Sequence, residues 1–262
     1  MFTTVIVPLD GSTLSEAALA PARSVASRLG LPIRLLTSSW GAQAEDGQAY
    51  LDRKAAELDL PGTTSVVVAD RFAATAIVES VADDPSPLVC MGTHGRTGIG
   101  RALLGSTAEE VIRSIEHPVL LVGPESTPLP AGGPTELLIT IDGSATSATA
   151  VDTAAEVART VGLTVVVVTV AEAGIADDPA GIDDVVEQFR SAGLDARSEA
   201  LTGKDPASAI AAFARSRPAP VICMATHGRG GIQRTALGSV AMKVVHQVTC
   251  PVLVVRPPSA QG

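Results

Sequence analysis

The chain contains the same stretch twice, and this internal repeat limits the folds open to it more than any other feature. Residues 87–124 align with residues 220–257 without a gap, and 20 of the 38 paired positions are identical. The two halves therefore derive from one domain, and two copies of one domain are expected to pair about a pseudo-twofold axis. The 262 residues are enough for two such domains, each with its own core.

A stretch rich in proline and glycine separates the two copies. Residues 123–135 contain four prolines and three glycines, which is typical of a linker between domains. We predict a first domain at 1–124, a linker at 125–135, a second domain at 136–257 and a tail at 258–262.

Within each half, apolar runs rich in valine, isoleucine and leucine alternate with helix-like segments. The predicted strands are 4–9, 32–37, 63–68, 88–91, 118–122, 137–141, 163–170, 196–201, 221–224 and 251–255. The predicted helices are 13–29, with a kink or a broken first turn at Pro21, and 44–58, 73–81, 106–115, 145–161, 183–192, 206–215 and 239–247. This alternation predicts an α/β fold of two tandem, doubly wound, Rossmann-like domains with parallel sheets.

A glycine-rich loop follows the fourth predicted strand. It contains Gly92 and Gly95, then nine residues, then Gly105 and Ser106. Glycines expose the backbone N–H groups to a bulky anion, and we expect Ser106 to cap a helix whose N-terminus also attracts anions. In such sheets the ligand lies at the carboxyl ends of the strands, where the strand order reverses. Asp10, at the end of the first strand, would face this loop if the first and fourth strands are neighbours.

Two common phosphate-binding motifs do not fit this loop. The chain has no G-x-x-x-x-G-K-[ST] sequence, and Leu103 stands where a G-x-G-x-x-G motif starting at Gly98 needs its third glycine. No nucleophilic serine elbow, paired-histidine zinc signature or calcium loop is present either.

The spacing resembles the ATP-binding motif G-2x-G-9x-G-[ST] of the universal stress protein family. The resemblance extends to the Val-Pro-Leu-Asp-Gly-Ser opening at 7–12 and the His-Pro-Val-Leu-Leu-Val ending at 117–122, and related segments recur in the second half. It implies a five-stranded sheet of order 3-2-1-4-5, of the adenine nucleotide alpha hydrolase-like type, which binds ATP or stays free of nucleotide.

The resemblance also implies roles for the loop residues. Asp10 would lie near the ribose or the phosphate-bound metal, Gly92 and Gly95 would let the backbone pass close to ribose and phosphates, and Gly105 and Ser106 would bind phosphate oxygens. Charge-assisted hydrogen bonds of this kind contribute roughly 1.5–3 kcal/mol each, so four or five would support micromolar affinity.

The second half keeps most of this pattern, in Asp142, Gly228, Gly238 and Ser239, but Ala225 replaces the first glycine. If that position needs a positive φ or lies against the ribose, the methyl group costs roughly 1–2 kcal/mol, about tenfold in affinity. The sequence therefore predicts a weaker second site.

Each site residue has a simpler alternative role. Asp10 could only hold the turn before the first helix, and Gly92 and Gly95 could form a tight turn without a ligand. His94 and His227 lie in the loops, but the sequence offers no positioned partner for a catalytic imidazole. We therefore predict no catalytic residue and no protein metal site.

These observations predict an ATP-binding regulatory protein of the stress response rather than an enzyme. Slow ATP hydrolysis, with Mg²⁺ or Mn²⁺ between the phosphates and Asp10, is one alternative, and a nucleotide-free dimerisation scaffold is another. An adenylate-transferring enzyme would need a further substrate domain, for which the chain has no spare residues. The regulatory partner protein is unknown.

Composition and charge limit the kinds of binding partner and the cellular location that are expected. The formal charge of −9 disfavours nucleic acid and acidic membrane surfaces as partners. The N-terminus lacks a signal-peptide pattern and no apolar run is long enough to span a membrane, so a cytoplasmic location is expected. Three cysteines without C-x-x-C spacing argue against disulfides and zinc, and Cys90 and Cys223 occupy matching strand positions typical of a core.

The fifth strand of each half should lie at a sheet edge. Apolar edge strands tend to pair, so we expect residues 119–122 and 252–255 to pair within the chain as an intrachain pseudo-dimer. The family resemblance makes a further homodimer plausible.

Overall fold

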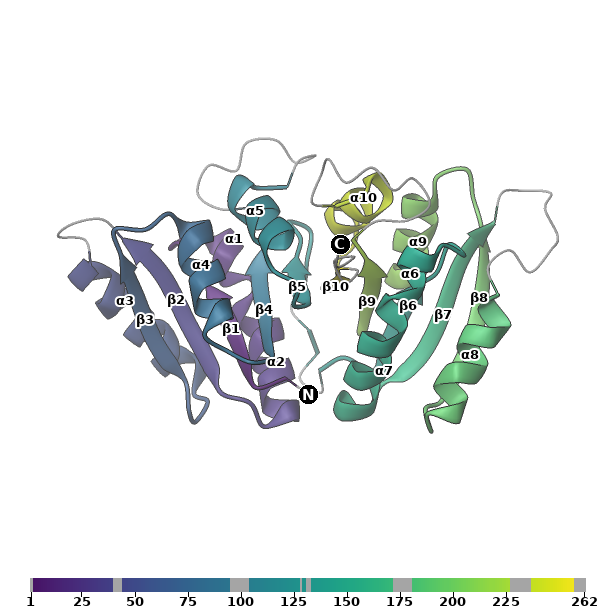
Figure 1. Ribbon diagram of the computed structural model, residues 1–262, viewed down its shortest axis with the longest axis horizontal. Coiled ribbons are helices and arrows are strands. Elements are labelled where there is room, and N and C mark those ends of the chain that lie inside the picture. Colours follow the sequence, from purple (N-terminus) through teal and green to yellow (C-terminus); the bar gives the residue numbers. More distant parts are fainter. Residues whose placement is uncertain are drawn as a thin grey trace, which may run out of the picture.

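A single ten-stranded sheet runs through both halves of the chain (Figure 1). The computed structural model describes residues 2–39, 44–94, 104–127, 129–130, 133–171, 181–226 and 237–256. The strands are β1 (Thr4–Pro8), β2 (Ile33–Ser39), β3 (Thr64–Ala69), β4 (Pro87–Gly92), β5 (Val119–Val122), β6 (Glu136–Thr140), β7 (Thr164–Ala171), β8 (Ala196–Thr202), β9 (Pro220–Ala225) and β10 (Val252–Val255). Their order is β3-β2-β1-β4-β5-β10-β9-β6-β7-β8, so each half has the predicted order 3-2-1-4-5.

Helices cover both faces of this sheet (Figure 1). One face is covered by α2 (Leu19–Leu29), α3 (Ala44–Leu58), α7 (Ala150–Val161) and α8 (Ile182–Ser191). The other is covered by α4 (Ala73–Ala82), α5 (Ser106–Ser114), α9 (Pro206–Arg215) and α10 (Ser239–Gln247). The core on each side is built almost wholly from aliphatic side chains, as parallel strands buried on both faces require.

The strand order reverses at β1. Val5 lies opposite Ile33 of β2 on one side and opposite Leu88 of β4 on the other, and both pairings are parallel. The carboxyl ends of β1 and β4 are therefore neighbours, as the position of Asp10 relative to the glycine loop requires.

The two halves join through their fifth strands, which confirms the predicted pairing within the chain. β5 and β10 are antiparallel, and Leu120 lies opposite Leu253.

The residues that directly follow β5 and β10 differ between the two halves. Gly123 packs so closely against the Val245 carbonyl of α10 that a side chain would collide with it. Arg256, at the equivalent position after β10, donates a hydrogen bond to the Arg113 carbonyl at the end of α5.

The first helix of each half is broken into two segments. α1 (Thr13–Glu16) precedes α2, and α6 (Ala145–Ala148) precedes α7. The sequence predicts a kink or a broken first turn from Pro21, and the helix is broken, but the second half breaks at the same place with Thr153 in the equivalent position. The proline is therefore not the cause. In both halves a serine ties the short helix to the end of the strand, since Ser15 Oγ accepts from the Asp10 N–H and Ser147 Oγ from the Asp142 N–H, each at 3.3 Å.

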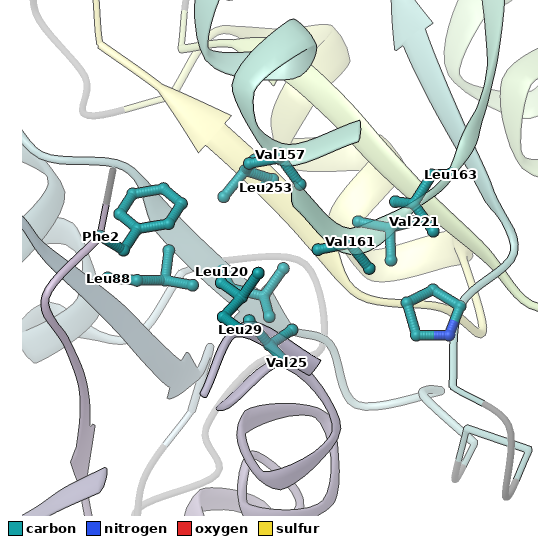
Figure 2. A pocket seen from close by; sticks show the side chains of 11 residues that line it. Phe2, Val25, Leu29, Leu88, Leu120, Val157, Val161, Leu163, Val221 and Leu253 are labelled. Carbon is teal, nitrogen blue, oxygen red and sulfur yellow. The ribbon is translucent and has the colours of Figure 1, made fainter. Parts of the chain in front are cut away.

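An apolar cavity of about 30 Å³ lies between the two halves (Figure 2). Its lining comes in pairs related by the repeat, such as Val25 of α2 with Val157 of α7, and Leu29 with Val161. The other lining residues are Phe2, Leu88, Leu120, Pro134, Leu163, Val221 and Leu253. The cavity therefore lies on the pseudo-twofold axis, at the amino ends of the central strands.

The three cysteines are buried thiols, as predicted for Cys90 and Cys223. Burial raises the pKa of Cys90, Cys223 and Cys250 to about 12 in each case. Among the described residues, no helix combines the length and the apolar character that crossing a membrane demands.

Candidate functional site

The Asp-Gly-Ser turn after β1 is held by its own side chains. Asp10 Oδ1 accepts hydrogen bonds from Ser12 N–H at 3.0 Å and from Ser12 Oγ at 2.6 Å. Gly11 has φ of +83°, which a side chain would strain. Ser12 Oγ in turn accepts from Ser15 N–H at 3.2 Å and so caps α1. The Asp10 carboxylate therefore does hold the turn, the simpler of its two predicted roles.

The second half repeats this turn almost unchanged. Asp142 Oδ1 accepts from Ser144 N–H at 3.0 Å and from Ser144 Oγ at 2.6 Å. Gly143 has φ of +78°. The hydrogen bonds within the turn therefore do not distinguish the two candidate sites.

Gly92 ends β4 directly against α1. A Cβ atom at Gly92 would lie 2.6 Å from the Leu14 carbonyl oxygen, a distance that real Cβ atoms do not adopt. Gly92 is not among the glycines with positive φ, so the first of the two conditions considered for this position, a left-handed backbone, does not hold. The position needs glycine because the backbone of α1 packs against it. In the second half, Ala225 is buried at the end of β9, so its methyl group must be accommodated beside α6.

Gly105 lies where the glycine loop returns to the protein. Its N–H donates to the Thr93 carbonyl at 2.8 Å, and a Cβ atom would lie 2.9 Å from the same oxygen. Gly105 is the N-cap of α5, and Ser106 is the first residue within the helix. Our prediction that Ser106 caps the helix is therefore wrong by one position. Because Ser106 lies in the first turn, its backbone N–H belongs to the group that points out of the helix N-terminus.

The second half has the same arrangement. The Gly238 N–H donates to the Thr226 carbonyl at 2.7 Å, Gly238 is the N-cap of α10, and Ser239 is its first residue. Thr93 and Thr226 are both almost fully buried. Each donates its backbone N–H to the carbonyl oxygen of the last residue of the neighbouring fifth strand, Val122 or Val255. The end of the loop is thus fixed in the same way in both halves.

His94 connects the first glycine loop to the other half of the chain. Its ring meets the ring of His246 on α10 edge to face, with 5.4 Å between centroids and 69° between planes. His94 Nδ1 lies 3.0 Å from Thr93 Oγ1, and His246 Nδ1 lies 2.7 Å from the Met242 carbonyl oxygen. The sequence singled out His94 as a loop residue but gave no sign of His246, because the contact depends on how the two halves pack.

The structure brings most of the predicted site residues together in two equivalent places. The first comprises Asp10, Gly92, Gly105 and Ser106 at the ends of β1 and β4 and the start of α5, and the second comprises Asp142, Gly238 and Ser239 (Figure 1). Gly95, Gly228 and His227 lie outside the described residues. Within the described ranges, no three His, Cys, Asp or Glu side chains are grouped so as to hold a metal ion.

Comparison with known proteins gives a consistent result. The model of the universal stress protein family matches residues 38–123 and 135–256. A universal stress protein of Mycobacterium tuberculosis strain H37Rv is 26% identical over 96% of this chain and 96% of its own length. One from Mycolicibacterium smegmatis is also 26% identical, over 97% of both chains.

Solved structures share the two-domain fold. A universal stress protein from Archaeoglobus fulgidus superposes with a TM-score of 0.76 and 21% identity, covering 97% of this chain and 98% of its own. A putative universal stress protein from Pseudomonas aeruginosa gives a TM-score of 0.69 at 20% identity, covering 98% and 94%. At this identity the structures support the fold alone, whereas the family model matches most of the sequence in two tandem segments. The chain belongs to the universal stress protein family.

Proposed function

We propose that the protein binds ATP at the carboxyl edge of its first half and acts as a cytoplasmic regulatory protein of the stress response. The observation that carries this proposal is the adjacency of β1 and β4. It brings the Asp10 turn, the end of β4 at Gly92 and the start of α5 to the point where the strand order reverses. In open α/β sheets, this is where nucleotides bind.

The proposal assigns the phosphates to the start of α5. Backbone N–H groups in the first turn of a helix have no partner within the helix and carry partial positive charge, so they favour an anion. Gly105 keeps the loop backbone against this turn, and no side chain fits between them. Asp10 would face the ribose or a phosphate-bound Mg²⁺ or Mn²⁺ while it continues to hold its turn.

The second site is proposed to be weaker because of Ala225, through packing rather than through a positive φ. Gly92 lets α1 approach the end of β4, and α1 is tied to the Asp10 turn through Ser15. The methyl group of Ala225 occupies the equivalent space and would shift α6 together with the Asp142 turn. The effect on affinity would therefore be indirect, through the position of the aspartate.

The first test is to identify any nucleotide that copurifies. The protein is denatured and the released nucleotide is separated by chromatography, and the nucleotide-free chain is then titrated with Mg-ATP by calorimetry. We expect adenine nucleotide, a tight site and a weaker one. Ser106→Glu places a negative charge at the start of α5 and should abolish the tight site, whereas Ser239→Glu should abolish only the weak one. Gly95→Ala should weaken the tight site.

The outcomes separate the alternatives. No released nucleotide and no binding of added ATP would favour the nucleotide-free scaffold. Two sites of equal affinity would contradict the assigned effect of Ala225. Turnover of bound ATP that needs Mg²⁺ or Mn²⁺ and is lost in Asp10→Asn would favour the slow ATPase.

A further inference from the structure

Helix α1 of the first half is bound by side chains of helix α3. The Tyr50 hydroxyl donates a hydrogen bond to Glu16 Oε1 at 2.9 Å, and Lys54 Nζ, one turn further along α3, lies 3.0 Å from Glu16 Oε2. Residues four positions apart lie on one face of a helix, which is why Tyr50 and Lys54 reach the same carboxylate. Glu16 is the last residue of α1, so both of its carboxylate oxygens bind one neighbouring helix.

Tyr50 and α3 are held in place by further contacts. The Tyr50 side chain packs against the core on this face of the sheet, and the Arg53 guanidinium lies over its ring, 5.9 Å from the centroid. Arg23 Nε of α2 donates to the Leu58 carbonyl at the end of α3, at 2.7 Å. The partners of Glu16 therefore belong to a helix that is fixed independently of α1.

The contact between α3 and α1 lies beside the turn that contains Asp10. Burial is the largest cause that raises the pKa of Tyr50, followed by the hydrogen bond to Glu16 and by the negative charges of Glu16 and Asp10, whereas the Gly11 N–H lowers it. The phenol therefore stays protonated at neutral pH and continues to donate to Glu16.

α1 is thus supported from both sides of β1. On one side, the end of β4 at Gly92 packs against the Leu14 carbonyl. On the other side, α3 packs over β2 and β3 (Figure 1) and binds Glu16. Ser15, next to Glu16, accepts the N–H of Asp10. A displacement of α1 would therefore move Asp10, so the contacts that fix Glu16 also position this aspartate.

The second half cannot repeat the contact with α3. Ala148 occupies the position of Glu16, Ala155 occupies the position of Arg23, and Tyr50 is the single tyrosine of the chain. The hydrogen bonds within the Asp142 turn match those of the first half. The support of α1 by α3 is therefore a feature that distinguishes the two candidate sites.

We propose that Glu16 and Tyr50 are positioning residues of the first nucleotide site, which hold α1 and the Asp10 carboxylate in the arrangement that binds Mg-ATP. This role rests on the proposed function, since the nucleotide site is itself proposed. The lack of such a support in the second half is then a further cause of weaker binding there, in addition to Ala225.

The test is the affinity of the tight site for Mg-ATP, measured by calorimetry on the full chain. Tyr50→Phe removes the hydroxyl and keeps the ring in the core, so the dissociation constant should rise roughly threefold to tenfold. Glu16→Ala releases both partners and should weaken binding at least as much. Glu16→Gln keeps an oxygen that accepts from Tyr50, so it should bind more tightly than Glu16→Ala.

The matched control is Gln48→Ala. It removes an exposed hydrogen bond between Gln48 and Asp52 on the same helix, without touching Glu16 or Tyr50. We expect the affinity for Mg-ATP to stay at the wild-type value.

A double-mutant cycle separates positioning of Asp10 from general stability. In the Asp10→Asn background, Tyr50→Phe should cause no further loss of affinity, because the carboxylate that it positions is already gone. The effect of Tyr50→Phe on the free energy of urea unfolding should persist in both backgrounds. A purely structural role would lower affinity by the same factor whether or not Asp10 is present.

The outcomes distinguish this role from the proposed function. If the wild-type chain binds no Mg-ATP, the proposed function fails and the positioning role fails with it. If the wild-type chain binds and Asp10→Asn weakens binding, while Tyr50→Phe and Glu16→Ala bind as tightly as wild type, the proposed function stands and the positioning role is overturned. Fully additive losses in the cycle would also overturn it, since Tyr50 would then act independently of Asp10.

Discussion

The ring of His94, in the first glycine loop, contacts the ring of His246, in the last turn of a helix from the other half of the chain. The Nε2 atom of each ring is buried and has no hydrogen-bond partner within the described part of the chain. In the repeat, His246 aligns with Arg113 of α5, so a pair of histidine rings cannot form at the equivalent place with α5. The contact links the loop proposed to hold ATP in the first half to α10. The N-terminus of α10, at Ser239, belongs to the candidate site of the second half.

This contact should be measurable as a coupling free energy. Edge-to-face aromatic pairs contribute about 1 kcal/mol beyond the area they bury. In a double-mutant cycle of His94→Ala and His246→Ala, we expect the two effects on the free energy of urea unfolding to be non-additive by about this amount. The control cycle pairs His246→Ala with His117→Ala, for which the effects should add. Additivity in both cycles would show that the two rings do not stabilise the loop.

Gly92→Ala should destabilise the first half. The new Cβ would meet the Leu14 carbonyl at 2.6 Å, so α1 must move away, at a cost of about 1–3 kcal/mol. The reciprocal change, Ala225→Gly, should lower stability less and strengthen ATP binding at the second site. Thermal unfolding and calorimetry measure the two effects. An unchanged melting temperature for Gly92→Ala would mean that α1 adapts without cost.

Val161→Leu should stabilise the interface between the halves. Val161 and Leu29 both line the apolar cavity, and the extra methylene of Val161→Leu fills part of that space, which is worth about 0.8 kcal/mol if it fits without strain. Leu29→Val is the matched control: it enlarges the cavity and should destabilise by roughly 0.5–1.5 kcal/mol. Both free energies follow from urea titrations. If both variants are destabilised, the cavity wall is too rigid for the larger side chain.

Glu136 should make stability depend on acid pH. Hydrogen bonds from Arg217, and next from Arg197, hold the pKa of Glu136 below its ordinary value despite burial. A carboxyl whose pKa is lower in the folded state stabilises above its unfolded value, about 4.3, and this stabilisation is lost as the pH falls through the folded value. Glu136→Gln should therefore cost about 2 kcal/mol at pH 7, and the difference from wild type should shrink in acid. A difference that stays constant with pH would exclude this origin.

The native thiols should resist thiol–disulfide exchange. Burial raises the pKa of Cys90, Cys223 and Cys250 to about 12, so almost no thiolate exists at neutral pH. We expect no reaction with a chromogenic disulfide in the folded protein and three equivalents after denaturation. Fast reaction of one thiol in the native state would reveal local opening near that residue.

Much of the fold follows from local patterns in the sequence. The apolar runs predict both ends of every described strand to within two residues. The repeat and the family resemblance together predict the strand order and the pairing of β5 with β10. The sequence predicts which residues form the candidate site, but the structural role of some of them differs from the predicted one. The requirement at Gly92 comes from the backbone of α1, and the cap lies at Gly105 rather than Ser106.

The remaining features depend on contacts between segments that are far apart in the sequence. The contact of His94 with His246 requires the packing of both halves, and no local pattern encodes it. For the break after α1 the sequence points to Pro21, because proline is the obvious local cause of a helix break. Only comparison with Thr153 in the second half shows that the tie from Ser15 to the strand end is the shared feature.

The joint between the halves also determines which domain can pair with which. Gly123 leaves room for the Val245 carbonyl, and Arg256 reaches the Arg113 carbonyl across the same axis. In a pair of two second domains, Arg256 would lie where Gly123 lies and would collide with the Val245 carbonyl. In a pair of two first domains, no arginine would be present to bind the Arg113 carbonyl. The interface has thus acquired the selectivity of a heterodimer, and the covalent linker fixes the ratio of its two members at one to one.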